Sequence, residues 1–508
     1  MNDLKNHFDP RYMRMAIELA LKGTGQVNPN PLVGAVIVKN GQVIGSGYHT
    51  AYGKLHAERE AFKSLKDPAD AEGANLYVTL EPCCHQGKQP PCTDAIISHK
   101  IRRVFVGSAD PNPLVAGKGN QILRDHGIEV YEDCLREECD RINEIFFHYI
   151  RDKKPYVMMK YAMTLDGKIA TVSGKSRWIT GPAARKKVHE DRNRLAAIMV
   201  GIGTVLTDDP MLNCRLDEFG PVSESGTIPE SGTIPESGQA ASEQTVSHPV
   251  RIVCDSKLRI PLDSTLVKTA RDIPVIVAAA RQSAFRASPS EDSSEEQTIK
   301  SHLLSENSSE EHSSPAFLLK ESQFLDKKSQ LESLGVKVIS IDPDPEGHVD
   351  LKKLVEILGK QEKIDSILLE GGARLHESAL KAGIVDKVQV YIAPKIFGGK
   401  HALSPVGGRG VDHPDQAYRF TEPEITRLGE DILLESYLIK DRDTDRDTHR
   451  DTDKDRDTDK DKDKDKDKDT DTDRDKEKGM DTDAHDSNQS SVCNTQEQEV
   501  SGTCLQES

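Results

Sequence analysis

The most constraining feature of this 508-residue chain is a set of metal-ligating side chains between residues 56 and 92. His56-Ala57-Glu58 opens a predicted helix, Pro82-Cys83 ends a predicted strand, and Cys92 follows nine positions later. One imidazole and two thiolates are ligands that tetrahedral zinc prefers, and the fourth position is left for water. The set therefore predicts a zinc site whose ligands come from the start of a helix, the end of a strand and the residues that follow.

Glu58 adds chemistry to this set, because a carboxylate two residues after the histidine can lie beside the water without binding the metal. In zinc deaminases the metal makes hydroxide available near neutral pH and a glutamate carries protons to the leaving amine. Other interpretations stay open: Cys83 and Cys92 could be buried thiols or a disulfide, and the generic motif has two residues between its cysteines where this chain has eight. We favour Cys83 over the adjacent Cys84 as a ligand, because Cys83 follows Pro82 at a strand end.

Apolar runs alternate with helical patterns across residues 1–150. The Asn40-Gly41 turn between the first two apolar runs is a strong hairpin signal. The alternation predicts one α/β domain around a single sheet. We expect strands at 32–38, 43–47, 75–80 and 103–107 and helices at 9–21, 56–65 and 93–99.

Residues 155–440 repeat this pattern after a boundary near Lys153-Lys154-Pro155, so we expect a second α/β domain. Thr180 is the expected N-cap of a helix over 182–195, with Pro182 in its first turn. A second helix is expected at 351–358. The expected strands lie at 155–163, 197–200, 250–255, 273–279, 336–341, 364–369 and 387–392.

Low-complexity segments interrupt and follow the second domain. Insertions at about 217–247 and 282–315 and a charged tail at 441–508 have too few apolar residues for a core, so we expect them to be disordered. The net charge is −17, but the two insertions and the tail together carry −22, so the other residues carry +5. A mildly basic body suits anionic small molecules and is a weak signal for nucleic-acid binding.

Composition also bounds the location of the chain. No apolar run approaches the roughly 20 residues that a membrane span needs, so we expect no membrane partner. The nine cysteines are scattered and the N-terminus has no apolar signal region. Both features favour a reducing, cytoplasmic location.

A second constellation follows residue 155. Ser176–Pro182 contains Trp178, the only tryptophan of the chain, in a polar loop where its ring could stack on a nucleotide; a buried core ring is the alternative. Residues 368–375 combine an apolar strand, a Gly371-Gly372 turn and a helix, the arrangement that binds phosphate at a helix N-terminus. The glycines could also form only a tight turn, and they lack the GxGxxG spacing of a Rossmann domain.

Taken together, these motifs resemble the bifunctional deaminase/reductase family of bacterial riboflavin biosynthesis, which has the wider cysteine spacing. The resemblance rests on Asn28–Gly34, His56–Glu58 and Thr79–Cys92, and it covers about residues 8–216, 248–281 and 320–440. The family's usual residue at position 84 is serine, so Cys84 is a small departure.

The resemblance implies a cytidine-deaminase-like zinc domain at 1–150 and a dihydrofolate-reductase-like, NADPH-dependent domain at 155–440. The first would deaminate 2,5-diamino-6-(5-phosphoribosylamino)pyrimidin-4-one, and the second would reduce the ribosyl group of the product to ribityl phosphate. A homo-oligomer is compatible with this resemblance. The cofactors are then Zn²⁺ and NADPH, and the partner is a phosphorylated pyrimidine.

The resemblance also assigns individual residues. Beside the zinc ligands His56, Cys83 and Cys92 and the catalytic Glu58, it implies substrate contacts from Asn28, His85 and Lys88. For NADPH it implies Ala162, Trp178, Thr204, Asp208, Ser256, Gly372, Ala373 and Arg374. For the reductase substrate it implies Ser176, Arg192, Leu212, Arg215 and Glu370. Arg192 and Arg215 suit a ribose phosphate because a guanidinium matches phosphate oxygens, and Asp208 is a candidate for acid/base work during hydride transfer.

Two other classes remain open. A zinc deaminase acting on tRNA would share the first site, but it would not explain the second domain and would favour a more basic surface. A non-catalytic interaction protein would depend mainly on the repeats and the tail.

Overall fold

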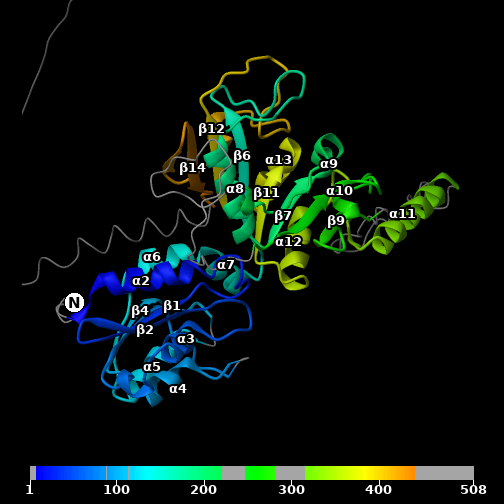
Figure 1. The fold of residues 1–508 in the computed structure, drawn as a ribbon. Coiled ribbons are helices and arrows are strands. Elements are labelled where there is room, and N and C mark those ends of the chain that lie inside the picture. The colour runs from blue at the N-terminus through cyan, green and yellow to red at the C-terminus, as the bar shows by residue number, and fades with distance from the viewer. Residues whose placement is uncertain (1–6, 87–88, 113–114, 220–245, 282–314, 441–508) are drawn as a thin grey trace, which may run out of the picture. The chain divides into compact units, whose positions relative to one another are not determined.

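A computed structural model describes residues 7–86, 89–112, 115–219, 246–281 and 315–440. They form a five-stranded and a nine-stranded sheet (Figure 1). Within these ranges no helix is long and apolar enough to cross a membrane. The predicted disorder falls almost entirely on 220–245, 282–314 and 441–508, which lie outside the described residues.

The first sheet has the strand order β2-β1-β3-β4-β5. β1 runs antiparallel to both β2 and β3, and β3, β4 and β5 are parallel to one another. Its strands are β1 (Gly34–Lys39), β2 (Gln42–Tyr48), β3 (Asn75–Leu80), β4 (Arg103–Ser108) and β5 (Glu129–Tyr131). The Asn40-Gly41 hairpin is confirmed: both residues have positive φ, and Lys39 pairs with Gln42 across the turn.

Helices cover both faces of this sheet, because side chains alternate between the faces along each strand. Ala35 and Ile37 pack in one buried cluster with residues of α3, α4 and α5, whereas Val36 and Val38 pack in another with residues of α2 and α6. Figure 1 shows these helices on the two sides of the strands. The helices are α2 (Pro10–Leu21), α3 (Ala57–Lys63), α4 (Cys92–Ser98), α5 (Lys118–Asp125), α6 (Arg136–Ile142) and α7 (Glu144–Asp152), with a 3₁₀ turn at Pro68–Ala71.

The second sheet has the order β10-β9-β8-β7-β11-β6-β12-β14-β13. It is parallel from β10 to β12 and ends in the antiparallel strands β14 and β13. The strands are β6 (Tyr156–Thr164), β7 (Ala197–Gly201), β8 (Val250–Cys254), β9 (Val275–Ala280), β10 (Val336–Ile341), β11 (Ser366–Gly371), β12 (Lys387–Ala393), β13 (Glu424–Leu428) and β14 (Asp431–Tyr437).

The centre of this sheet is buried on both faces, as expected for parallel strands between helices. One apolar cluster joins it to α12 and α13, and another joins it to α9, α10 and Leu331 of α11. The helices are α8 (Pro182–Arg194), α9 (Ile202–Asp208), α10 (Thr265–Lys268), α11 (Pro315–Ser333), α12 (Leu351–Lys360) and α13 (Ala373–Lys381), with 3₁₀ turns at Leu216–Phe219 and Pro414–Gln416.

The structure confirms every predicted strand and helix within about two residues at most ends, and corrects one cap. The N-cap of α8 is Gly181 rather than Thr180. The N–H of Gly181 donates to Oδ2 of Asp431 at 2.7 Å. The sequence analysis did not predict β5, β13, β14 or the helices α5, α6, α7, α9, α10 and α11.

Candidate active sites

The three predicted zinc ligands converge at one end of the first sheet. His56 is the N-cap of α3, Cys83 follows β3, and Cys92 is the first residue of α4. Nδ1 of His56 lies 3.4 Å from Sγ of Cys83 and 3.3 Å from Sγ of Cys92. All three ligand atoms lie within 4.8 Å of one another, and Cys92 is fully buried.

This donor set fits zinc. Tetrahedral bonds of about 2.3 Å to sulfur and 2.0–2.1 Å to nitrogen separate neighbouring ligand atoms by about 3.6 Å, close to the observed distances. The hydrogen bond between the thiols lowers the pKa of Cys83 to about 4 and raises that of Cys92. The two thiols thus share a proton that a cation can replace.

Glu58 lies in the first turn of α3 and is 3% exposed. Burial raises its pKa, and the nearby Cys83 thiolate adds to the effect. A carboxyl group that holds a proton more tightly than usual is suited to carrying protons. Glu58 therefore has the environment that the predicted role requires.

The loop after Cys83 contains the other predicted contacts. Cys84 is not part of the ligand cluster, which supports Cys83 as the ligand. His85 is exposed. Lys88 lies outside the described residues.

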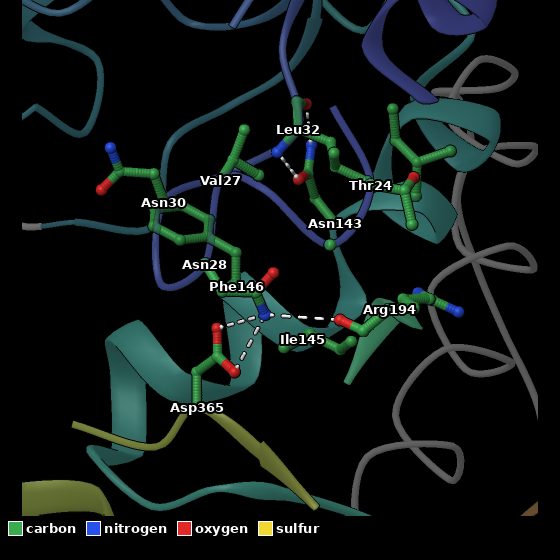
Figure 2. A pocket seen from close by; sticks show the side chains of 12 residues that line it. Thr24, Val27, Asn28, Asn30, Leu32, Asn143, Ile145, Phe146, Arg194 and Asp365 are labelled. Atoms are coloured by element: carbon green, nitrogen blue, oxygen red, sulfur yellow. Dashed lines mark hydrogen bonds between the residues drawn. The ribbon is translucent and has the colours of Figure 1, made fainter. Parts of the chain in front are cut away.

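The structure does not bring Asn28 to the zinc ligands. Its Nδ2 donates to Asp365, at 3.1 Å to Oδ1 and 3.0 Å to Oδ2 (Figure 2). Asn30, two residues later, instead donates to Nε2 of His49 at 3.1 Å. The His49 ring lies 5.8 Å from that of His56. The sequence analysis quoted Asn30 only as part of a motif, and the register of the loop decides which asparagine faces the site.

Glu81 is another group that the sequence analysis missed. Its carboxylate accepts backbone N–H bonds from Gly117 at 2.9 Å and Gly119 at 3.0 Å. A Cβ at Gly119 would lie 2.1 Å from the carbonyl oxygen of Pro82. Glu81 thus caps α5 from a distant strand and holds the residues around Cys83 against that helix.

A pocket of about 700 Å³ lies over the second sheet and is the second candidate site. It brings together most of the residues predicted to bind NADPH or the reductase substrate. Ser256 and Arg374 do not line the pocket; the Ser256 hydroxyl instead accepts a hydrogen bond from the N–H of Val349 at 3.1 Å. The predicted residues in its wall are Ala162, Ser176, Trp178, Arg192, Thr204, Asp208, Leu212, Arg215, Glu370, Gly372 and Ala373.

Arg192 and Glu370 form a bidentate ion pair inside this pocket. Nε and Nη2 of Arg192 each lie 2.7 Å from a carboxylate oxygen of Glu370, and Nη1 donates to the carbonyl oxygen of Asn213 at 3.0 Å. Burial alone would raise the pKa of Glu370, but the charges of Arg192 and Lys160 lower it to about 2. Arg192 therefore holds an ionised Glu370, whereas the guanidinium of Arg215 is partly exposed and its Nε lies 3.9 Å from Oε2 of Glu218.

Lys160, which is partly buried, and His189, which is buried, are polar residues of the pocket that the sequence analysis did not single out. Burial lowers the pKa of the Lys160 ammonium, although Glu370 opposes the shift. Burial, together with the charges of Arg192 and Arg215, lowers the pKa of His189 to about 4. For Lys160 a signal existed, since a lysine interrupts the apolar strand β6.

Trp178 is 60% exposed and lines the pocket, so it is not a core residue. The guanidinium of Arg185 lies 4.5 Å from the centre of its ring. A flat exposed ring beside a cation is a surface on which a nucleotide can stack.

The glycine turn before α13 fits the phosphates of a dinucleotide. Gly372 has a φ of +94°, and a Cβ at Gly371 would lie 3.2 Å from Oγ1 of Thr204. In the part of the chain that the structure describes, no side chain caps α13. An uncapped helix N-terminus beside two glycines offers backbone N–H groups to an anion.

Comparisons with known proteins agree with this pair of sites. Residues 155–434 match the model of the RibD C-terminal domain, and residues 6–108 match that of the cytidine and deoxycytidylate deaminase zinc-binding region. The riboflavin biosynthesis protein RibD of Actinobacillus pleuropneumoniae is 46% identical over 438 residues, which cover 86% of this chain and 97% of that protein.

Two solved structures are similar over most of the chain. Acinetobacter baumannii RibD is 32% identical with a TM-score of 0.64, covering 86% of this chain and 100% of that one. A Thermotoga maritima diaminohydroxyphosphoribosylaminopyrimidine deaminase/5-amino-6-(5-phosphoribosylamino)uracil reductase is 34% identical with a TM-score of 0.60, covering 85% of this chain and 98% of that one.

Proposed function

The chain belongs to the RibD family and is a bifunctional, zinc- and NADPH-dependent deaminase and reductase of riboflavin biosynthesis, and from this premise we infer how its residues divide the two reactions. The convergence of His56, Cys83 and Cys92 beside Glu58 is the observation that carries the assignment of the first reaction. The alternative of a tRNA deaminase is not favoured, because the reductase-domain match spans 155–434.

In the first reaction the substrate is 2,5-diamino-6-(5-phosphoribosylamino)pyrimidin-4-one, as the name of the Thermotoga relative suggests. His56, Cys83 and Cys92 hold the zinc, which when bound makes hydroxide available near neutral pH. Glu58 takes a proton from the attacking water and passes it to the amine. A carbon–oxygen bond forms as the carbon–nitrogen bond breaks, and ammonia leaves.

Substrate contacts come from residues around the metal. We assign Asn30, together with the predicted His85 and Lys88, to the pyrimidine and its ribose phosphate. Asn30 donates to His49, and the His49 ring contacts that of His56, so Asn30 lies close to the proposed zinc ligands. Asn28 has a different role, which is considered below.

In the second reaction the ribosyl group is reduced to ribityl phosphate. NADPH, when bound, supplies the hydride. We place the cofactor against Trp178, Thr204, Asp208 and the turn at Gly372–Ala373, with Ala162 in the floor. Ser256 and Arg374 are the predicted contacts that this pocket does not support.

Within that pocket the chain positions the sugar and supplies a proton. Arg215 and Ser176 bind the phosphate end, and Glu370, held by Arg192, binds sugar hydroxyls. Reduction at the sugar carbon would release the ring oxygen from that carbon, and this oxygen would need a proton. Lys160 lines this pocket, its ammonium has a lowered pKa because of burial, and we assign it as the donor.

Other expectations stay proposals. We propose domain boundaries of 1–150 and 155–440, in line with the two sheets, and a charged tail at 441–508. We propose a cytoplasmic location, in line with seven cysteines that form no disulfide with one another in the described ranges. Self-association rests only on the resemblance.

Glu58→Gln tests the division of labour. The variant keeps one zinc per chain, since Glu58 is not a ligand, and loses ammonia release by about 10²–10⁴-fold. NADPH oxidation with the deaminated pyrimidine stays at the wild-type rate. Metal analysis and two separate assays measure these outcomes, and deamination at a near wild-type rate would remove Glu58 from the mechanism.

A further inference from the structure

The loop between α2 and β1 carries two asparagines that point to different places. Nδ2 of Asn28 donates to both carboxylate oxygens of Asp365 and lies 3.5 Å from the carbonyl oxygen of Arg194. Figure 2 shows these contacts at a small cavity lined by residues of both domains. Asn30 faces His49 instead. Only one residue, Pro29, separates a contact with the reductase domain from a contact near the zinc ligands.

The Asn30 contact leads directly to the metal site. Nδ1 of His49 lies 2.9 Å from the carbonyl oxygen of Leu55, the residue before His56. His49 therefore carries its proton on Nδ1 and accepts from Asn30 at Nε2.

Asp365, the partner of Asn28, is itself held in place by burial and hydrogen bonds. Its side chain is buried at 2% exposure, and Oδ1 also accepts a hydrogen bond from Oγ of Ser366 at 2.6 Å. Its carbonyl oxygen accepts the N–H of Tyr156 at 2.8 Å, which ties it to β6. A buried carboxylate needs such partners, so the bond from Asn28 is costly to lose.

The other end of the loop is fixed within the deaminase domain. Asn143 accepts the N–H of Leu32 at 2.8 Å and donates to the carbonyl oxygen of Leu32 at 2.9 Å. Asn143 is 1% exposed. Asn30 therefore lies between two residues that are held by hydrogen bonds. Leu32 is bound by Asn143 of the same domain, and Asn28 is bound by Asp365 of the reductase domain.

We propose that Asn28 is a positioning residue for deamination: its bond to Asp365 sets the loop that presents Asn30 to the substrate, so the reductase domain helps to shape the deaminase site. The proposal rests on the assignment of Asn30 to that site. It replaces the predicted substrate contact of Asn28, whose amide is occupied by Asp365.

Asn28→Asp in the full chain tests this, because it places a second carboxylate against Asp365. We expect the KM for the deaminase substrate to rise about ten-fold, the loss expected for a buried hydrogen bond to a charged group. We expect a smaller change in kcat, one zinc per chain, and reductase activity within about two-fold of wild type. If Asn28→Asp does not fold, the same measurements are made on Asn28→Ala, which removes the hydrogen bond without adding a charge.

Reciprocal exchange separates positioning from general damage. The double variant Asn28→Asp/Asp365→Asn restores a carboxylate–amide pair with the partners exchanged. We expect its KM to return most of the way to the wild-type value. Tyr149→Phe is the matched control, since it removes a bond of 3.0 Å to the carbonyl oxygen of Gly359, which also joins the two domains but does not involve the loop. The control is expected to leave the KM unchanged.

Three results would overturn the proposal: a KM within about two-fold of wild type in Asn28→Asp, no recovery in the double variant, or an equal shift in Tyr149→Phe. Asn30→Ala distinguishes the two levels of inference. If Asn30→Ala impairs deamination and Asn28→Asp does not, the proposal fails and the proposed function stands. If Asn30→Ala has no effect, the assignment of Asn30 fails as well.

Discussion

The zinc site and the reductase pocket are assembled differently. At the zinc site three ligand atoms lie within 4.8 Å of one another and come from residues 56–92. The reductase pocket has a volume of about 700 Å³ and takes its lining from Lys160 to Pro405. A single ion can organise the first site, whereas the second must be filled by a cofactor and a substrate that its walls hold over a large area. The loss of one contact should therefore reduce deamination at the zinc site more than the loss of one contact in the pocket reduces the reductase activity.

The largest expected effect comes from Cys92→Ser. A hydroxyl is a poor zinc ligand, so we expect the metal to be lost and deamination to fall by at least about 10³-fold. NADPH oxidation with the deaminated pyrimidine should persist. Metal analysis beside the two assays measures both, and retention of one zinc per chain would mean that Cys84 or another cysteine replaces Cys92.

Glu370→Gln tests whether the reductase pocket has one dominant contact. The change removes the charge that Arg192 and Lys160 face, so we expect reductase kcat/KM to fall by about 10²-fold. Deamination should be unchanged. Steady-state kinetics on each substrate measures both activities. If Glu370→Gln lowered the reductase activity as much as Cys92→Ser lowers deamination, the two sites would not differ in their dependence on one contact.

Trp178→Ala removes one exposed wall of the pocket. We expect the KM for NADPH to rise about ten-fold, in the range of a lost stacking contact, with kcat little changed. Arg185→Ala is a useful companion, because its guanidinium lies over the same ring. If deamination and reduction were equally impaired, the ring would be acting on stability rather than on the cofactor.

The smallest effect is a pH dependence of stability from His189. Its pKa is about 4 in the folded chain, below its ordinary value of 6.5, mainly because the ring is buried. The unfolded chain then binds more protons between these values, so its contribution to stability is complete above about pH 6.5 and is lost as the pH falls toward 4. His189→Asn keeps an acceptor for the N–H of Arg215 and should flatten this part of a Tm-against-pH curve. An unchanged slope would show that His189 does not cause it.

Local pattern was enough to predict much of the fold. The Asn40-Gly41 hairpin, the strand at 75–80 and the helix at 10–21 follow from residue period, turn chemistry and a proline start, which act over a few neighbours. The elements that were missed lack such local signals. α7 and β14, for example, take their stability from partners distant in sequence, such as the contact of Tyr437 with Glu144 at 2.7 Å.

The zinc ligands and Glu58 could be predicted from residue types and positions, because metal chemistry restricts residue type and a helix start and a strand end restrict direction. Only the folded chain shows that Asn30 rather than Asn28 lies near the predicted zinc ligands, that Arg192 is bound to Glu370, and that Lys160 lines the same pocket. Such facts depend on where residues more than a hundred positions apart meet. No local sequence pattern predicts these contacts, because they depend on the order of the strands in each sheet and on the pairing of side chains between the two domains.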